Sequence, residues 1–426
     1  MASKIRKGNC KEKKEFVIFA DVPPIPSEER LIKYKQAGFT YYNLTEDYVV
    51  RDTEDGKISD EYYKAIDDCH KAGLKVVLRT MRSNSPDYYD TVTDEFVGKT
   101  DGYYMCDEPS YFYVGWYGSC PIDKLVKLVD YYNEHGGDTL FHINLLQDYG
   151  MRLVHGKNPP RFEDYLDDYI EKVLKKVKGE KSLSTDHYPI AFDKEGVYCI
   201  KESALRDYYL IADRSKKLKA EGHDIRTGYC IQLTSDKGLF IREMECAEDV
   251  LFQTNFALAF GASLLEYYLY VGRGTGIISD KLTQLNYTPV YNWVKDANAV
   301  VNKLGDLLDY DWNATKTYLG TEKIDEHNKR AFESVKKFQP TSFAKVKGFT
   351  STADAILSEF VSDKGYAYMA VNYTEPTSKT ENVVTFDLGD EKSAIVIIDG
   401  VSSTTETENG KITVKLLAGQ GVIVIA

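Results

Sequence analysis

The sequence predicts an α/β protein in two parts, a (β/α)8 TIM barrel followed by a small antiparallel β-sandwich. Between about residues 15 and 300, short apolar runs alternate with amphipathic stretches of helical period. Several of these stretches end in a glycine, such as Gly73, which is the usual residue after a helix. Farther on, short alternating strands and turn pairs such as Asn409-Gly410 become the main pattern. The barrel is therefore expected at residues 1–310 and the sandwich at 311–426.

Eight strands are expected in the barrel, each followed by a helical stretch or a polar loop. The strands lie at residues 15–21, 39–44, 74–79, 102–107, 139–144, 182–186, 226–232 and 262–268. The clearest helical patterns lie at residues 60–72, 122–134, 162–178, 202–221, 246–260 and 288–307. Eight successive βα units close most economically into a parallel barrel. An open doubly wound sheet is the alternative, but no glycine-rich phosphate motif follows the first strand.

Composition and charge limit the possible partners. The net charge of −12 disfavours nucleic acid and anionic membranes, and no segment approaches the roughly eighteen apolar residues of a membrane span. The seven cysteines are scattered without a CxxC pair, which indicates reduced thiols and argues against a zinc site. No metal or cofactor is expected, and the oligomeric state is left open. The basic N-terminus has no apolar stretch behind it, so we expect a cytoplasmic protein, or a secreted one whose leader has been removed.

The most informative motif is Asp107-Glu108-Pro109, which closes the apolar run 102–106. Two acids at the end of a buried strand are out of place unless a function requires them. Pro109 has no N–H for the strand ladder and ends the strand, so Glu108 is expected at the C-terminal tip. Active sites of parallel barrels lie at that end of the strands. Glu108 is therefore the first candidate for a catalytic acid.

Polar residues also mark the tips of the other strands. Because the C-terminal ends of barrel strands converge, these side chains are expected around one site that suits a hydroxyl-rich ligand, a carbohydrate. They are Asp21, Asn43, Arg79, Asn144, Gln147, Asp186, Tyr188, Gln232, Glu266 and Tyr268. Taken singly, most of them are more simply explained as solvated loop residues or helix caps. Asp186 is an exception like Glu108, because Pro189 soon ends its strand.

The alternation of side chains along a strand predicts which way each one faces. If Glu108 faces the barrel axis, Tyr104 and Cys106 face it too, and Asp107 turns toward the helices or the rim. By the same rule His187 faces away from the neighbouring Asp186, which favours a structural role for this histidine.

Three further features are ambiguous. The glycine-rich run 272–276 lies near the customary phosphate site of such barrels, but a flexible loop explains it better. The aromatic run 111–117 follows the acid motif and is interpreted as the wall of a sugar subsite, with a loop packed on the rim as the alternative. The 33 tyrosines suit stacking on sugars, although they have a purely compositional explanation as well. No lysine lies at the tip of strand six, which disfavours a Schiff-base aldolase.

The chain resembles the glycoside hydrolases of clan A over most of its length. The likeness rests on residues 102–109, 184–189 and 256–262, and on the ending 417–425, which is similar to the last strand of sandwich domains that follow such barrels. The clan usually carries Asn-Glu-Pro on strand four, so the resemblance implies that Glu108 is the general acid/base. Asp107 replaces the asparagine that contacts the 2-hydroxyl of the sugar. Gln232 stands where the clan has its nucleophile, so the mechanism of the clan does not carry over intact.

Glycoside hydrolysis usually needs one protonated and one ionised carboxyl beside the glycosidic bond. The expected function is therefore a glycoside hydrolase acting on an oligosaccharide or polysaccharide. Glu108 is the acid, and Asp186, or else Glu266, is the second catalytic carboxyl. Asp107 is expected to raise the pKa of Glu108 by like-charge repulsion, and the anomeric outcome is left open. The main alternative is a non-catalytic carbohydrate-binding barrel that lost its nucleophile at Gln232, followed by a transglycosylase or a phosphorylase.

Overall fold

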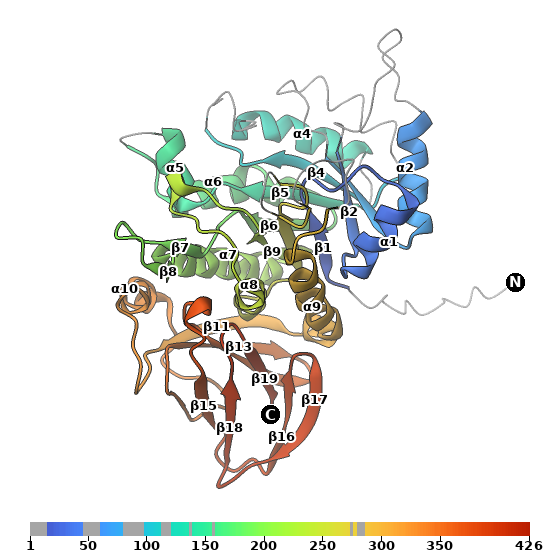
Figure 1. Ribbon diagram of the computed structural model, residues 1–426. Helices are drawn as coiled ribbons and strands as arrows, with labels where there is room; N and C mark the ends of the chain where they lie inside the picture. Colours follow the sequence, from blue (N-terminus) through green and yellow to red (C-terminus); the bar gives the residue numbers. More distant parts are fainter. Residues whose placement is uncertain are drawn as a thin grey trace, which may run out of the picture.

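The computed structural model describes residues 15–45, 60–79, 98–111, 121–135, 139–155, 158–272, 276–278 and 286–426. Figure 1 shows a barrel surrounded by helices, with a β-sandwich packed beneath it. The predicted fold class, a TIM barrel followed by an antiparallel sandwich, is confirmed. Among the described residues, no helix combines the length and the apolar character needed to cross a membrane.

The barrel is a single eight-stranded parallel sheet that contains all eight predicted strands. In chain order they are β1 (Val17–Ala20), β2 (Tyr41–Thr45), β3 (Lys75–Arg79), β4 (Gly102–Asp107), β5 (Leu140–Leu145), β6 (Lys181–Thr185), β9 (Ile225–Gln232) and β10 (Leu264–Tyr268). Their spatial order is β1-β10-β9-β6-β5-β4-β3-β2. The ring closes between β1 and β2, where the amide of Thr40 donates to the carbonyl of Ile18 at 3.0 Å.

Helices pack around the outside of this sheet (Figure 1). They are α1 (Glu28–Gln36), α2 (Asp60–Lys71), α4 (Ile122–His135), α5 (Asp148–His155), α6 (Phe162–Lys172), α7 (Glu202–Ala220), α8 (Ala247–Ala259) and α9 (Val290–Lys303). The helix predicted at 162–178 is shorter than expected, because it tightens into a 3-10 turn at Leu174–Lys176. The sequence analysis missed α5 and the hairpin of β7 (Ile190–Phe192) and β8 (Tyr198–Ile200), which follows β6.

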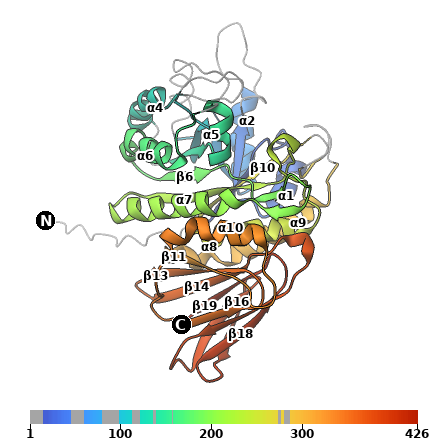
Figure 2. The same cartoon turned by 90° about the vertical axis from the view of Figure 1, so that its left-hand side faces the viewer.

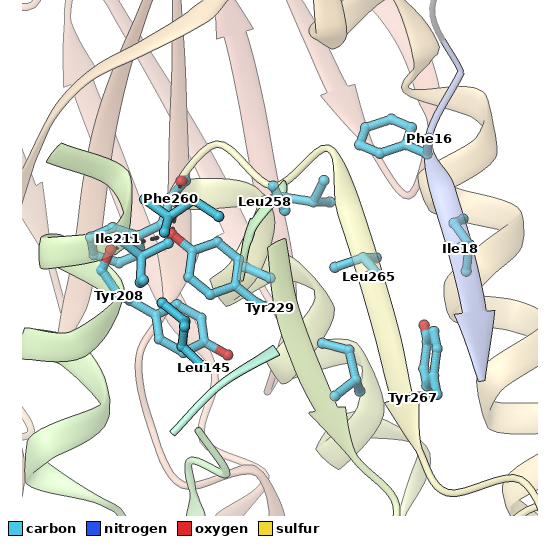
Figure 3. Packing of buried hydrophobic residues seen from close by; sticks show 14 of the residues in the cluster. Phe16, Ile18, Leu145, Tyr208, Ile211, Tyr229, Leu258, Phe260, Leu265 and Tyr267 are labelled. Carbon is cyan, nitrogen blue, oxygen red and sulfur yellow. Dashed lines mark hydrogen bonds between the residues drawn. The ribbon is translucent and has the colours of Figure 1, made fainter. Parts of the chain in front are cut away.

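Tyrosine side chains fill much of the layer between the strands and the helices. The ring of Tyr208 on α7 stacks between those of Tyr229 on β9 and Phe256 on α8, with centroids 4.1 and 4.2 Å away. The hydroxyl of Tyr229 donates to the carbonyl of Phe260 at 3.1 Å (Figure 3). Among the described residues, the largest fully buried side chains are all tyrosines. Much of the tyrosine content therefore belongs to the core of the fold.

The C-terminal part contains a six-stranded sheet, β11-β13-β14-β19-β16-β17, and a three-stranded sheet, β12-β15-β18. The strands are β11 (Asp311–Tyr318), β12 (Gly348–Ser351), β13 (Ala355–Ser362), β14 (Gly365–Asn372), β15 (Asn382–Asp387), β16 (Ser393–Ile398), β17 (Val401–Glu406), β18 (Lys411–Leu416) and β19 (Gly421–Ile425). All of the pairs within these sheets are antiparallel. Helix α10 (Glu326–Val335) lies after β11.

The barrel rests on the sandwich through its helices, and Figure 2 shows α8 and α10 between the two bodies. The side-chain amide of Asn255 on α8 donates to the carbonyl of Gly419, just before β19, at 2.9 Å. The rings of Phe252 and Phe256 on α8 contact Tyr373, at the end of β14. The interface is thus partly apolar and partly hydrogen-bonded.

Candidate active site

Strand β4 carries the acid motif, and its side chains do not alternate regularly. The register between β4 and β5 shifts between Tyr104 and Cys106, which marks a bulge in β4 at Met105. Tyr104 therefore faces the barrel axis, whereas Cys106 packs in the outer layer near the tyrosines of α6. Asp107 returns to the interior, where the hydroxyl of Tyr104 donates to it at 2.9 Å. The predicted orientations of Cys106 and Asp107 were wrong, because the bulge shifts the alternation by one residue.

Glu108 leaves the line of β4 and meets Asp186, which directly follows β6. Its φ of 47° is left-handed, and its amide donates to the carbonyl of Asn144 at 2.8 Å. The carboxyls of Glu108 and Asp186 lie close enough for each to influence the protonation of the other, and the two residues are only 8% and 9% exposed. The fold thus brings together the two acids that the sequence analysis ranked first.

Burial governs the protonation of this pair. It raises the pKa of Glu108 well above its usual range, and the negative charges of Asp186 and then Asp107 raise it further. Burial, followed by the charge of Asp107, raises the pKa of Asp186 to about 7, against hydrogen bonds from Tyr188 and Cys230 that lower it. Near neutral pH, Glu108 therefore retains a proton and Asp186 is close to its titration point. The charge of Asp107 raises the pKa of Glu108 as expected, although burial raises it more.

Arg79 bridges two acids on the opposite side of the site. Its guanidinium donates to Asp21 and, at 2.8 Å, to Asp107, and it lies 4.8 Å from the ring of Tyr104. The side-chain amide of Asn43 also donates to Asp21, at 3.2 Å. These four predicted site residues form one network across β1, β2, β3 and β4. The Oδ1 atom of Asn43 has no hydrogen-bond partner among the described residues, and it suits a hydrogen bond from a sugar hydroxyl.

Glu266 lies deeper in the barrel and is paired with a histidine that the sequence analysis missed. Nε2 of His142 is 3.2 Å from Oε2 of Glu266, and Nδ1 is 2.7 Å from the hydroxyl of Ser182. Burial lowers the pKa of His142 to about 3 and raises the pKa of Glu266. His142 is therefore neutral near pH 7, and the raised pKa of Glu266 favours its protonated form, in which the carboxyl can donate to Nε2. His142 is two residues before Asn144 on β5, so alternation from that residue is the signal that points to it.

Tyr188 and Tyr268 form an aromatic wall beside the acid pair. Their rings are nearly parallel, with an angle of 26° and centroids 6.0 Å apart. Tyr188 also packs in a small apolar cluster with Cys230 and Ile241. Cys230 faces Asp186 from β9 and was also missed, although it precedes Gln232 by two residues and so shares its face of the strand.

The remaining predicted residues have different surroundings. Gln232 is fully buried, and its amide accepts from the backbone N–H of Ile190 and donates to the carbonyls of Thr234 and Arg242. It therefore holds backbone segments together. Gln147 is buried beside the site, with no partner for its Oε1 atom among the described residues.

The tip of β6 is anchored from behind by His187, in agreement with the structural role expected for it. Its Nδ1 atom is 2.7 Å from Oδ2 of Asp207 on α7, and both residues are fully buried. The same carboxyl oxygen accepts from the amide of Asp148 at the start of α5, at 3.1 Å. Asp207 thus connects the segment after β6 to the start of α5.

Two ambiguous segments lie mostly outside the described residues, namely the glycine-rich run at 273–275 and the aromatic run at 112–117. Tyr111 is described, and its hydroxyl donates to Asp168 at 3.0 Å. In the part of the chain that the structure describes, no group of three or more His, Cys, Asp or Glu side chains is arranged to hold a metal ion.

Neither a family model nor a curated protein matches this sequence. Solved structures do resemble it over nearly the whole chain. A family 42 β-galactosidase from G. stearothermophilus aligns with a TM-score of 0.58 at 8% identity, covering 96% of this chain and 98% of its own. A family 39 glycoside hydrolase from Bacteroides cellulosilyticus aligns with a TM-score of 0.54 at 12% identity, covering 97% of this chain and 81% of its own. The α-galactosidase I from Mortierella vinacea aligns with a TM-score of 0.51 at 10% identity, covering 97% of this chain and 96% of its own. At this identity, the likeness establishes a fold shared with glycoside hydrolases.

Proposed function

We propose that the protein is a glycoside hydrolase in which Glu108 is the general acid and Asp186 is its ionised partner. The observation that supports this function is the pair of buried, neighbouring carboxyls with raised pKa values at the tips of β4 and β6. Glycoside hydrolysis requires two carboxyls with different protonation states. The fold shared with glycoside hydrolases agrees with the same function.

The proposed reaction begins with transfer of the Glu108 proton to the glycosidic oxygen as the C–O bond breaks. The positive charge that develops at the anomeric carbon is stabilised by the Asp186 carboxylate. We assign Asp186 as the second catalytic carboxyl, which acts as the nucleophile of a retaining route at a carboxyl separation of about 5 Å, or as the base that activates water in an inverting route at roughly 6.5–9.5 Å.

Other residues are assigned to substrate binding in this proposal. Asp21, Asn43, Arg79, Asp107, Asn144 and Gln147 supply polar atoms around the acid pair. Tyr188 and Tyr268 supply aromatic faces for a sugar ring. The substrate class is an oligosaccharide or a polysaccharide. Glu266 is assigned as a proton-bearing neighbour, because it is paired with a neutral histidine below the acid pair.

A carbohydrate-binding barrel without turnover is the second candidate. The observation that favours it is Gln232, since this tip residue holds backbone segments where a carboxylate nucleophile would be expected from the resemblance.

A screen of aryl glycosides and natural oligosaccharides separates the two functions. It compares wild type with Glu108→Gln and Asp186→Asn, and measures both turnover and glycan binding by calorimetry. Glu381→Gln serves as the control, because Glu381 lies on the sandwich in an exposed pair with Lys415. Turnover that is lost in both site variants and kept in the control supports the hydrolase. Glycan binding without turnover in wild type supports the binding barrel.

A further inference from the structure

A buried ion triad joins the barrel to the sandwich close to the active site. Arg242, in the segment after β9, is 3% exposed. Its guanidinium donates two hydrogen bonds to Asp249 on α8, at 2.8 and 2.5 Å. It donates a third, at 2.5 Å, to Glu375, which lies in the sandwich after β14. Breaking a buried ion pair leaves an uncompensated charge, so these bonds hold Arg242 against both Asp249 and Glu375, while its Nε atom has no partner among the described residues.

The backbone of Arg242 is also tied to the barrel. Its carbonyl accepts from the amide of Gln232 at 2.7 Å, and its own N–H donates to the carbonyl of Ile190 at 3.3 Å. The other end of the Gln232 amide accepts from the N–H of Ile190 at 3.2 Å. The guanidinium also lies 4.9 Å from the ring of Tyr198 on β8. The side-chain amide of Gln232 therefore connects the tip of β9 to the β7–β8 hairpin and to the backbone of Arg242.

The residue before the triad reaches the acid pair. Ile241 packs against Tyr188 and Cys230, and it also bridges to Ala191 in β7. Tyr188 and Cys230 both lie beside Asp186 and lower its pKa. A continuous set of neighbouring residues thus runs from Glu375 through Arg242 and Ile241 to Asp186.

We propose that the sandwich positions the wall of the active site through Glu375 and Arg242. Glu375 is a positioning residue, because it acts on Asp186 and Tyr188 through the Ile241–Arg242 segment without touching the substrate. The assignment of this wall to a sugar site rests on the proposed function, whereas the mechanical coupling does not. The proposal also gives Gln232 a physical role, since a carboxylate there would repel the carbonyls of Thr234 and Arg242 that its amide binds.

Glu375→Gln tests the coupling without leaving an unpaired buried charge, because Arg242 keeps both bonds to Asp249. Glu381→Gln is the matched control: it makes the same substitution on the same sandwich, in a pair with Lys415 in which both side chains are more than half exposed. Hydrogen–deuterium exchange is followed in both full-length variants. We expect the amides of Ile190 and Arg242 to exchange about tenfold faster in Glu375→Gln, with β2 and β3 unchanged. The control is expected to match wild type.

Kinetics then separate positioning from stability alone. In Glu375→Gln we expect kcat/KM to fall about five- to tenfold with most of the change in KM, and the acidic limb of the pH profile to move. Glu375→Asp keeps the charge and is expected to recover part of the loss, which also provides a foldable variant if the amide variant does not fold. Unchanged exchange at Ile190 and Arg242 in folded Glu375→Gln, or an equal increase in the control, would overturn the coupling. Faster exchange in a chain that hydrolyses no glycoside would keep the coupling and reject only the proposed function.

Discussion

At the scale of single residues, the backbone of Glu108 is the clearest sign of a site. Its φ of 47° lies in a region that non-glycine residues rarely occupy. Strained backbone of this kind costs about 1–3 kcal/mol and persists where neighbouring bonds fix it, commonly at functional sites. Here the bond from its amide to Asn144 provides that restraint. The turn directs the Glu108 carboxyl toward Asp186, so the local geometry accounts for the acid pair.

Replacing Glu108 by glutamine removes the proton donor and keeps the shape of the side chain. We expect kcat to fall by about 10²–10⁴, the usual contribution of a general acid, with little change in glycan affinity. Aryl glycosides with activated leaving groups need less protonation and should lose less. A variant that retains full kcat on unactivated substrates would show that Glu108 is not the acid.

The pH dependence of wild type follows from the two raised pKa values. Asp186 must be ionised, so kcat/KM should rise as the pH increases through about 7. Glu108 must be protonated, so kcat/KM should fall at higher pH, above the raised pKa of Glu108. The measurement is a profile of kcat/KM from pH 4 to 10. A profile whose acidic limb lies near pH 4 would contradict the burial of Asp186 in the free enzyme.

Asp107→Asn tests the electrostatic role of the neighbouring acid. The charge of Asp107 raises the pKa of both Glu108 and Asp186, so its removal should move both limbs of the profile to lower pH. The asparagine oxygen can still accept from Arg79, and its NH2 group can donate to the hydroxyl oxygen of Tyr104, which limits structural change. An unmoved profile would show that burial alone sets the two pKa values.

At the scale of elements, the tip of β6 depends on α7. Asp207 is fully buried and binds both His187 and the amide of Asp148, so it connects β6, α5 and α7. Elements joined by buried polar contacts keep a fixed relative position, because breaking one contact leaves its partner unsatisfied. This helix therefore supports the placement of Asp186 without touching it.

Asp207→Ala should reduce the free energy of unfolding by about 1–3 kcal/mol, since it leaves His187 without its buried partner. Asp213→Ala is the control on the same helix, because the carboxyl of Asp213 is partly exposed and pairs with Arg214 and Lys217. In this control we expect the free energy of unfolding to fall by at most about 1 kcal/mol. Urea unfolding followed by circular dichroism measures both. Equal losses in the free energy of unfolding would show that the buried contact of Asp207 contributes no more to stability than the partly exposed pairs of Asp213.

The sequence predicted the elements better than it predicted the direction of their side chains. Period and turn residues located all eight barrel strands, because each strand is bounded by a glycine, a proline or a polar loop. The bulge in β4 could not be predicted, because residues 102–106 are apolar throughout and show no polar alternation that would reveal a shift. The three-residue strands β7 and β8 were also missed, since so short a segment has no measurable period.

The sequence allowed the site residues at the strand tips to be predicted. It did not reveal residues farther from the tips or their hydrogen-bond partners. Glu108, Asp186, Arg79 and Asp21 come together because barrel strands converge at their C-terminal ends. His142 and the partners of Gln232 depend on contacts between distant segments, which no local pattern encodes.

At the scale of the whole molecule, the site makes the folded state bind protons more tightly than the unfolded chain. Burial raises the pKa values of Glu108, Asp186 and Glu266. The contribution of such carboxyls to the free energy of unfolding is greatest below their ordinary pKa values. It is lost as the pH rises through the folded values. The active site therefore opposes the stability of the fold at neutral and alkaline pH, as expected where function requires buried charge.

Asp186→Asn should reveal this cost directly. The amide cannot ionise, so the variant avoids burying a charge, and its free energy of unfolding should exceed that of wild type by roughly 1–4 kcal/mol at pH 8. At pH 4 the carboxyl is protonated in the folded state and about half protonated in the unfolded chain, so the two proteins should differ by less than about 1 kcal/mol. Urea unfolding at a series of pH values gives the difference. The exposed-pair variant Glu381→Gln should show no such increase. A difference that stays constant from pH 4 to pH 8 would mean that Asp186 titrates normally in the folded state, and the acid pair would then lose its physical basis.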